Sequence, residues 1–266
     1  MTEVGGVAAA AGGARMADET FDQLLRDAED AAFSGWDFSW LRGRMIEEPR
    51  PWDYAALVRA AFPGVHSLLD IGTGGGERLG ALSPLPPHTY ATEGYPPNVA
   101  LARARLEPFG VRVVATASED ALPFPDGTFD LVIDRHTGAR ATEVHRVLRL
   151  GGRFITQQVG SRHNWELVAA VTGAARRLPP ASSLGPFRCE IEEAGFRVTE
   201  SIECFPVTRV RDVGAVVYYL RAIPWMVPGF SVTTHRERLR AIHERLRGEG
   251  ELRLTSHYFL LTAVKR

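Results

Sequence analysis

A glycine-rich turn at the end of a short apolar run constrains the fold of this chain most strongly. Residues 65–71 are largely apolar, and glycines follow at positions 72, 74 and 76. The run predicts a buried strand, and the glycines predict a tight loop whose positive φ angles let a ligand approach the backbone. Residues 77–82 can then open a helix whose first amides face the loop. The spacing differs from the G-x-G-x-x-G of dinucleotide-binding proteins.

The composition is that of an ordinary globular protein. The 266 residues are 45% hydrophobic and 24% charged, with a formal net charge of −1, so no global field favours nucleic acid or an anionic membrane. No run approaches the roughly 18 apolar residues of a membrane span. Cys189 and Cys204 make no disulfide framework and show no metal-ligand spacing. We therefore expect no metal site and a reducing compartment, the cytoplasm.

The region before the glycine-rich unit has two parts. Residues 1–17 are rich in alanine and glycine and are expected to be a disordered tail. Residues 18–62 show helical periodicity and predict a helical lid segment. Within this segment, residues 36–41 include three aromatic side chains. These rings either pack on the core or close over the ligand side of the glycine loop.

From residue 63 to residue 266, strand and helix patterns alternate, which predicts a parallel sheet with crossover helices on both faces. A helix over residues 140–150 is expected to end at Gly151-Gly152. A helical insertion at about residues 208–250 separates the last two strands. The expected strands cover residues 65–71, 88–93, 111–115, 129–134, 153–159, 196–205 and 256–264.

Three motifs in order resemble the class I S-adenosylmethionine (SAM)-dependent methyltransferase superfamily, of the methyltransferase type 11 kind. Residues 70–76 resemble its D-x-G-x-G-x-G loop, residues 117–130 resemble its adenine-contacting segment, and residues 146–153 resemble its R-V-L-x-P-G-G-x motif, with Leu150 in place of proline. The resemblance covers residues 65–159. It implies an α/β fold: a Rossmann-like, seven-stranded, mostly parallel sheet with helices on both faces, an antiparallel last strand and a helical cap. It also implies SAM as the cofactor.

Candidate cofactor contacts lie at the carboxyl ends of the strands, where such sheets bind ligands. Asp70 can accept from a ligand amine or order the loop, and Glu93, about twenty residues past the loop, suits bidentate binding of ribose hydroxyls. The resemblance implies an adenine contact at Ser118, where family members usually carry Asp. The expected cofactor-binding residues are Asp70, Gly72, Thr73, Gly74, Gly76, Glu93, Gly94, Ser118, Glu119 and Asp134.

The candidate catalytic residues are Asp134 and His136, just past the fourth strand, where the family presents residues to the methyl group. Methyl transfer from SAM mainly requires a nucleophile held in line at about 3 Å. A base is needed only if the acceptor arrives protonated. His136 is then the candidate base, because imidazole titrates near neutrality. Alternatively, His136 only donates a hydrogen bond or lines the pocket.

The candidate substrate pocket combines one glutamine with aromatic residues. Gln157 and Gln158 are adjacent on the fifth strand, so only one of them faces the ligand. The aromatic residues either wall an apolar pocket or pack in the core. The expected pocket residues are Trp36, Trp40, Gln157, Tyr218, Tyr219 and Trp225.

Three functions remain open from the sequence. The first is an EC 2.1.1 methyltransferase that acts on O, N or C of a small-molecule acceptor, in small-molecule or secondary metabolism, as a monomer or homodimer. The second keeps the fold but catalyses an elimination or cyclisation, with or without a partner subunit, and Ser118 motivates it. The third is an RNA methyltransferase. Glutamates offset the arginines of residues 233–247, so we expect a solvated face and no nucleic-acid partner.

Overall fold

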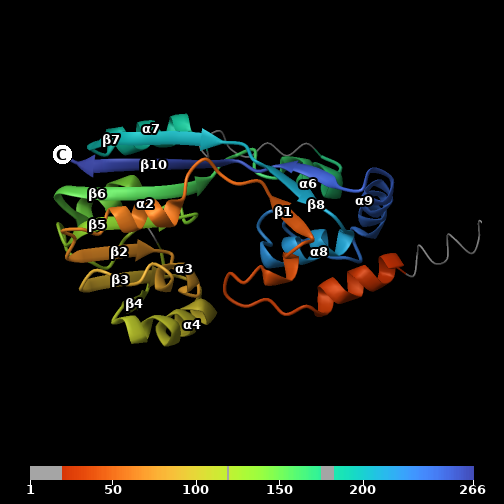
Figure 1. Cartoon of the computed structure of the whole chain (residues 1–266), viewed down its shortest axis with the longest axis horizontal. Coiled ribbons are helices and arrows are strands. Elements are labelled where there is room, and N and C mark those ends of the chain that lie inside the picture. The colour runs from red at the N-terminus through yellow and green to blue at the C-terminus, as the bar shows by residue number, and fades with distance from the viewer. Residues whose placement is uncertain (1–19, 119, 175–182) are drawn as a thin grey trace, which may run out of the picture.

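The computed structural model describes residues 20–118, 120–174 and 183–266. The expected disordered tail, residues 1–17, lies outside the described residues, as does Glu119. Two units make up the described chain. A large sheet with its covering helices occupies one end, and a smaller accessory unit occupies the other (Figure 1).

The large sheet has seven strands in the order β4-β3-β2-β5-β6-β10-β7. The pairs β4/β3, β3/β2, β2/β5 and β5/β6 are parallel, and β10 runs antiparallel to both of its neighbours. The expected Rossmann-like sheet with an antiparallel last strand is therefore confirmed. The strands are β2 (Ser67–Ile71), β3 (His88–Glu93), β4 (Arg112–Ala115), β5 (Phe129–Arg135), β6 (Leu148–Val159), β7 (Phe196–Cys204) and β10 (Tyr258–Lys265).

Helices cover both faces of this sheet because the central strands are apolar on both sides. All five residues of β2 are buried, as expected for a strand covered twice. Leu68 packs with α2, α3 and α4 on one face, whereas Leu69 packs with α5 and α7 on the other. The helices are α2 (Tyr54–Ala60), α3 (Glu77–Gly80), α4 (Pro96–Leu106), α5 (Ala141–Val147) and α7 (Leu184–Glu193), with a 3-10 turn, η2 (Glu107–Phe109), after α4.

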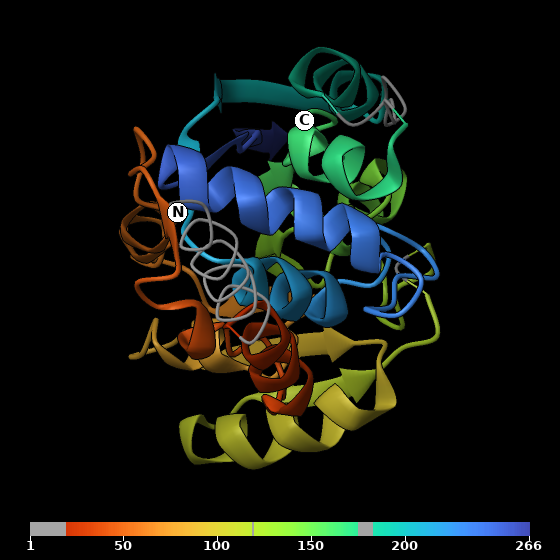
Figure 2. The same ribbon diagram turned by 90° about the vertical axis from the view of Figure 1, so that its right-hand side faces the viewer.

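The accessory unit is built from segments far apart in the chain. A three-stranded antiparallel sheet, in the order β1-β8-β9, joins the region before the glycine loop to both ends of the late insertion. Its helices share one core that includes Phe21, Leu167 and Tyr218 (Figures 1 and 2). Its elements are helical residues 20–30, η1 (Ser39–Leu41), β1 (Met45–Glu47), α6 (Trp165–Thr172), β8 (Val207–Val210), α8 (Val213–Ala222), α9 (Arg236–Glu249) and β9 (Leu252–Thr255).

Two local expectations were wrong. No strand was expected within the helical lid segment, residues 18–62, yet it also contains strand β1, which pairs with β8 about 160 residues later in the chain. The helix expected to end at Gly151-Gly152 ends at Val147, and β6 begins at Leu148. Leu148 pairs with Phe129, so the two glycines lie within a strand. Pairing with β5 overrides the glycine stop signal there.

Candidate functional site

The glycine loop between β2 and α3 is fastened to the end of β3. Gly72, Gly74 and Gly76 have φ angles of +66°, +64° and +81°, which residues with a side chain rarely adopt. The Gly72 amide donates to Thr92 Oγ1 at 3.3 Å, and the Thr73 amide donates to the Thr92 carbonyl at 2.9 Å. The end of β3 therefore sets the shape of the loop.

The carboxylate of Glu93, at the end of β3, also binds the glycine loop. The side chain is 7% exposed. Its Oε2 accepts the Gly74 amide and its Oε1 accepts the Tyr95 amide, each at 2.7 Å. A carboxylate has about four acceptor positions, so each oxygen retains one for a further donor. This arrangement fits a ribose diol, whose two hydroxyls would donate to Glu93. Gly94 follows directly and is exposed.

Two other segments pack closely against the glycine loop. A Cβ atom at Gly72 would lie 2.1 Å from Thr137 Oγ1, and one at Gly74 would lie 2.6 Å from Cδ1 of Trp36. Thr137 also donates its hydroxyl to the Ile71 carbonyl at 3.2 Å. The loop is thus held between the turn after β5 and the N-terminal aromatic segment, and Trp36 reaches the loop as a lid residue would.

Asp70 is a buried acid at the end of β2, next to the glycine loop. Burial is the main cause that raises the pKa of its carboxyl from 3.8 to about 7. Asp134 and Glu93 raise it further, while Thr73 and Arg135 act in the opposite direction. Near neutrality the group therefore stands between its neutral and its ionised form, ready to ionise beside a cationic ligand.

This raised pKa predicts a pH dependence of stability. The folded chain holds the Asp70 proton more tightly than the unfolded chain, so the stabilisation is complete below pH 3.8 and is lost as the pH rises through 7. Between pH 4 and pH 8 we expect the free energy of unfolding of the wild type to fall by a few kcal/mol relative to Asp70→Asn. Urea titrations of both proteins across this range measure the difference. Parallel pH curves would contradict the raised pKa.

Asp134 is fully buried at the end of β5. Its Oδ1 accepts the Thr137 amide at 3.1 Å, and its Oδ2 accepts the Ala139 amide at 3.0 Å. Burial raises the pKa of Asp134, and these two hydrogen bonds lower it. Both oxygens therefore shape the turn after β5. The geometry supports Asp134 as the residue that positions this turn rather than as a group that contacts the acceptor.

His136 lies in this turn with a φ angle of +70°. Gln157, fully buried on β6, connects it to Trp52: the Trp52 indole N–H donates to Gln157 Oε1 at 2.8 Å, and Gln157 Nε2 lies 2.9 Å from His136 Nε2. An indole N–H only donates, so the Gln157 group that faces His136 is the NH₂, which also only donates. His136 Nε2 must accept, and the proton of the neutral ring lies on Nδ1.

The charge state of His136 agrees with this tautomer. Burial, followed by the charges of Arg135 and Arg50, lowers the pKa of His136 well below its ordinary value of 6.5. The ring is also stacked on Tyr258, with 5.7 Å between ring centres and 17° between planes. A neutral ring with its Nε2 lone pair engaged presents a donor, not a base. The hypothesis that His136 only donates is therefore favoured over general-base catalysis.

The tautomer is directly measurable. In ¹H–¹⁵N correlation spectra of imidazole, we expect His136 to remain neutral with its proton on Nδ1 between pH 6 and pH 8. Gln157→Leu removes the donor to Nε2 and should mix the two tautomers. Gln158→Leu is the matched control, since its side chain binds Thr156 Oγ1 at 2.8 Å instead. A ring that carries its proton on Nε2, or a cationic ring at pH 6, would contradict the assignment.

Ser118 lies in the loop after β4. Its Oγ accepts the Asp120 amide at 3.0 Å, and its backbone is held by the Thr116 hydroxyl. A hydroxyl oxygen has two acceptor positions and one donor, so Ser118 retains one position to accept and one proton to donate. The position is compatible with the expected adenine contact, although an aspartate there would offer more acceptors.

The expected pocket aromatics divide into two groups. Trp40 and Tyr218 stack at 4.8 Å inside the accessory unit, where Tyr218 is 2% exposed. Tyr219 is also interior, and its hydroxyl accepts from Asn164 at 2.9 Å. Trp36 and Trp225 meet edge to face at 5.9 Å while remaining 40% and 61% exposed. Core packing therefore explains the interior residues, whereas Trp36 and Trp225 stay candidates for ligand contact.

The segment between Pro49 and Tyr54 contributes site contacts that the sequence did not indicate. Arg50 lies 4.0 Å over the Tyr258 ring, Trp52 binds Gln157, and the Tyr54 hydroxyl donates to the Asp134 carbonyl at 3.4 Å. No spacing within the segment signals these contacts, because all three partners lie at least 80 residues away.

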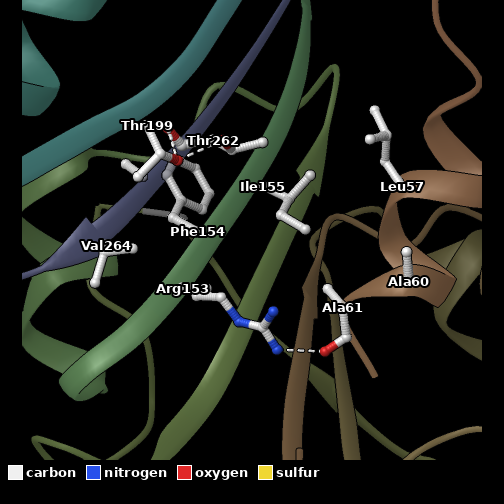
Figure 3. A pocket seen from close by; sticks show the side chains of 10 residues that line it. Leu57, Ala60, Ala61, Arg153, Phe154, Ile155, Thr199, Thr262 and Val264 are labelled. Atoms are coloured by element: carbon white, nitrogen blue, oxygen red, sulfur yellow. Dashed lines mark hydrogen bonds between the residues drawn. The ribbon is translucent and has the colours of Figure 1, made fainter. Parts of the chain in front are cut away.

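A shallow depression of about 220 Å³ lies elsewhere on the sheet, between α2 and the strands β6, β7 and β10 (Figure 3). Ile155, Thr199 and Thr262 are among its lining residues, and Arg153 crosses its floor to the Ala61 carbonyl. None of the expected site residues lines it; the candidate site lies instead at the carboxyl ends of β2, β3 and β5. No helix in the described part of the chain is long and apolar enough to cross a membrane.

Comparison with known proteins relates part of the chain to one family. Residues 69–156 match the family described as "Methyltransferase domain". Over 148 residues the chain is 34% identical to methyltransferase tpcM of Aspergillus fumigatus, which covers 51% of this chain and 43% of that protein. Over 99 residues it is 31% identical to the uncharacterized methyltransferase YcgJ of Bacillus subtilis, with 34% and 39% covered. Each match thus spans well under half of the relative's length.

Solved structures show the same fold. The YcgJ structure has a TM-score of 0.54 at 18% identity, covering 80% of this chain and 98% of that one. The [4+2]-cyclase SpnF has a TM-score of 0.53 at 17% identity and covers 92% of each chain. At such identities the likeness concerns the fold alone. Together with the family match and the seven-stranded sheet, it supports the resemblance of residues 69–156 to the class I SAM-dependent methyltransferase superfamily.

Proposed function

We propose that this chain binds SAM at the glycine loop and transfers its methyl group to O, N or C of a small-molecule acceptor. The observation that carries the proposal is the Glu93 carboxylate. It holds the Gly74 and Tyr95 amides at 2.7 Å and keeps one acceptor position free on each oxygen. A buried carboxylate poised in this way beside a glycine loop suits the two ribose hydroxyls of an adenosine ligand.

Different site residues would contact different parts of the cofactor. Glu93 would hold the ribose, Ser118 would contact the adenine amino group, and Asp70 would face the amino-acid end. When bound, SAM supplies a methyl group that its sulfonium has already activated. The protein then has to orient the acceptor and exclude water. Because His136 Nε2 is already hydrogen bonded, the acceptor would arrive as an anion or another unprotonated nucleophile.

The acceptor would lie between the glycine loop and the accessory unit. Trp36 contacts the loop at Gly74, and Trp225 of the late insertion meets Trp36. These two exposed rings come from different segments and offer apolar surface to a small molecule. The α9 arginines give little support to an RNA substrate, since Arg236 pairs with Asp22, and Arg245 pairs with Glu249.

A second candidate is a reaction without methyl transfer, such as a cyclisation or elimination, alone or with a partner subunit. Two observations favour it. Ser118 offers fewer acceptors to adenine than an aspartate would, and a solved protein named as a [4+2]-cyclase shares the fold over 92% of this chain. In this case the cofactor would be bound but not consumed.

Titration calorimetry with S-adenosylhomocysteine (SAH) tests the cofactor proposal. We expect one SAH bound per chain, and no measurable binding would contradict it. The second candidate predicts that SAM binds equally well but that its methyl group stays in place. Mass spectrometry of the cofactor after turnover with an acceptor library distinguishes the two reactions.

A further inference from the structure

An arginine whose side chain has no partner among the described residues lies beside the proposed methyl-transfer site. Arg135 ends β5 directly before His136 and is half-buried. Its backbone pairs with Gln157 of β6, but its guanidinium group makes no hydrogen bond or ion pair with any residue in the described ranges. Burial, together with the positive charges of Arg78 and Arg50, lowers the pKa of Arg135 to about 10. Half-buried guanidinium groups normally have a carboxylate partner, so this one lacks its expected counter-ion.

Arg50 adds a second unsatisfied donor to the same place. Its guanidinium pairs with Glu47 at 2.6 Å and lies 4.0 Å over the Tyr258 ring. Its Nε atom is buried and has no hydrogen-bond acceptor among the described residues. A buried N–H without an acceptor destabilises the folded chain. This destabilisation is removed when a ligand oxygen accepts the hydrogen.

His136 supplies the third donor. Its ring stacks on the same Tyr258 that Arg50 covers, and its proton lies on Nδ1 because Nε2 accepts from Gln157. No hydrogen bond to His136 Nδ1 is formed within the described chain. Three side chains from two segments, Arg50 before α2 and the pair Arg135 and His136 at the end of β5, therefore bring N–H donors together without a matching set of acceptors among the described residues.

The acids nearby do not provide the missing acceptors. Glu47 is already shared by Arg50, the Ser256 hydroxyl at 2.9 Å and the Tyr258 hydroxyl at 2.7 Å. Asp70 acts on Arg135 only at long range, without an ion pair, and its pKa of about 7 leaves it partly neutral. The local charge is therefore positive, and bound SAM would add its cationic sulfonium.

We infer that the acceptor carries a carboxylate or similar anionic group, which Arg135 binds together with Arg50 Nε and His136 Nδ1. The inference rests on the proposed function and names the chemical class of its substrate. The place of Arg135 in the sheet favours the acceptor over the cofactor as the molecule that carries the anionic group. Gln157, Tyr258 and Arg135 sit on the β5–β6–β10 half of the sheet, whereas Glu93 and Ser118 serve the β2–β3–β4 half.

An anionic acceptor also agrees with a neutral His136 that donates a hydrogen bond and does not act as a base. A carboxylate needs no proton removed before it binds or reacts, so a neutral His136 that only donates is sufficient. Hydrogen bonds to a charged group contribute about 1.5–3 kcal/mol each. Loss of the Arg135 contact should therefore weaken an anionic ligand by about 10-fold to 100-fold.

Benzoate and benzamide are matched probes that differ in charge but hardly in shape. Their affinities can be measured by titration, with intrinsic tryptophan fluorescence as the signal, for the wild type, Arg135→Gln and the control Arg188→Gln, with and without SAH. We expect the wild type and the control to prefer benzoate by about 10-fold or more, and Arg135→Gln to lose the preference. Because Arg135 forms no ion pair within the described part of the chain, its replacement should leave the melting temperature unchanged or higher.

A second pair of probes separates the acceptor from the cofactor. SAH and 5′-methylthioadenosine share the adenosine, but only SAH carries a carboxylate. If Arg135→Gln weakens SAH and spares 5′-methylthioadenosine, Arg135 binds the cofactor and the inference is overturned. It is also overturned if the wild type does not distinguish benzoate from benzamide. If SAH fails to bind the wild type, the proposed function fails, while the benzoate comparison without SAH still decides the anion site.

Discussion

Gly72→Ala is expected to destabilise the protein by about 3 kcal/mol and to abolish SAH binding. A Cβ atom at this position would lie 2.1 Å from Thr137 Oγ1 and 3.0 Å from Thr137 Cβ, and the φ angle of +66° is unfavourable for alanine. The side chain of Thr137 cannot turn away from both contacts, so the loop or the turn after β5 has to move. Urea unfolding and SAH calorimetry measure the two effects.

Gly110→Ala is the matched control for this substitution. Gly110 has a similar φ angle of +72°, but a Cβ atom there would meet nothing within 4 Å. Its replacement isolates the conformational cost, about 1 kcal/mol, and should leave SAH binding intact. Equal destabilisation of the two variants, with SAH binding preserved in both, would show that close packing of the glycine loop is unimportant.

Glu93→Gln is expected to weaken SAH binding by about 100-fold, because hydrogen bonds to a charged acceptor contribute about 1.5–3 kcal/mol each. The amide retains one oxygen but turns an NH₂ group toward either the Gly74 or the Tyr95 amide, where two donors would then face each other. The glycine loop would lose one of its attachments to β3, and the ribose would lose an acceptor. Calorimetry of the purified variant measures the loss.

Glu237→Gln is the corresponding control, since Glu237 is exposed in the first turn of α9, in the accessory unit. It should bind SAH as the wild type does. If Glu93→Gln retains wild-type affinity and a wild-type melting temperature, then Glu93 neither orders the loop nor contacts the ligand, and the proposed cofactor site is wrong.

The main sheet could be predicted because its signals are local. Continuous apolar runs such as β2 and β5 mark strands that are covered on both faces, and the glycine loop follows β2 at a characteristic spacing. The resemblance to a known superfamily then ordered the strands. The carboxyl ends of β2, β3 and β5 consequently meet where the sequence placed the site.

The accessory sheet could not be predicted because its pairing is long range. Met45 pairs with Val210, and Val210 pairs with Leu252. Each strand has only three or four residues, too few to establish a periodicity of two. The same limit applies at Gly151-Gly152, where pairing with β5 converts an expected helix end into part of β6.

The sequence predicted which residues lie at the candidate site but not what each of them does there. The sequence placed His136 near the reacting group, but its tautomer depends on Trp52 and Gln157, which lie 105 residues apart. Asp134 was expected among the catalytic and cofactor-binding residues, but both of its oxygens are used by amides of its own turn. Hydrogen-bond partners of this kind become visible only in three dimensions.

The most direct test of the cofactor proposal is a crystal structure of the protein with SAH. The account predicts SAH at the glycine loop, with both ribose hydroxyls within hydrogen-bond distance of the Glu93 carboxylate and the adenine beside Ser118. Ordered SAH at any other place, such as the depression between α2 and β10, would contradict it. So would crystals grown in saturating SAH whose glycine loop binds no ligand.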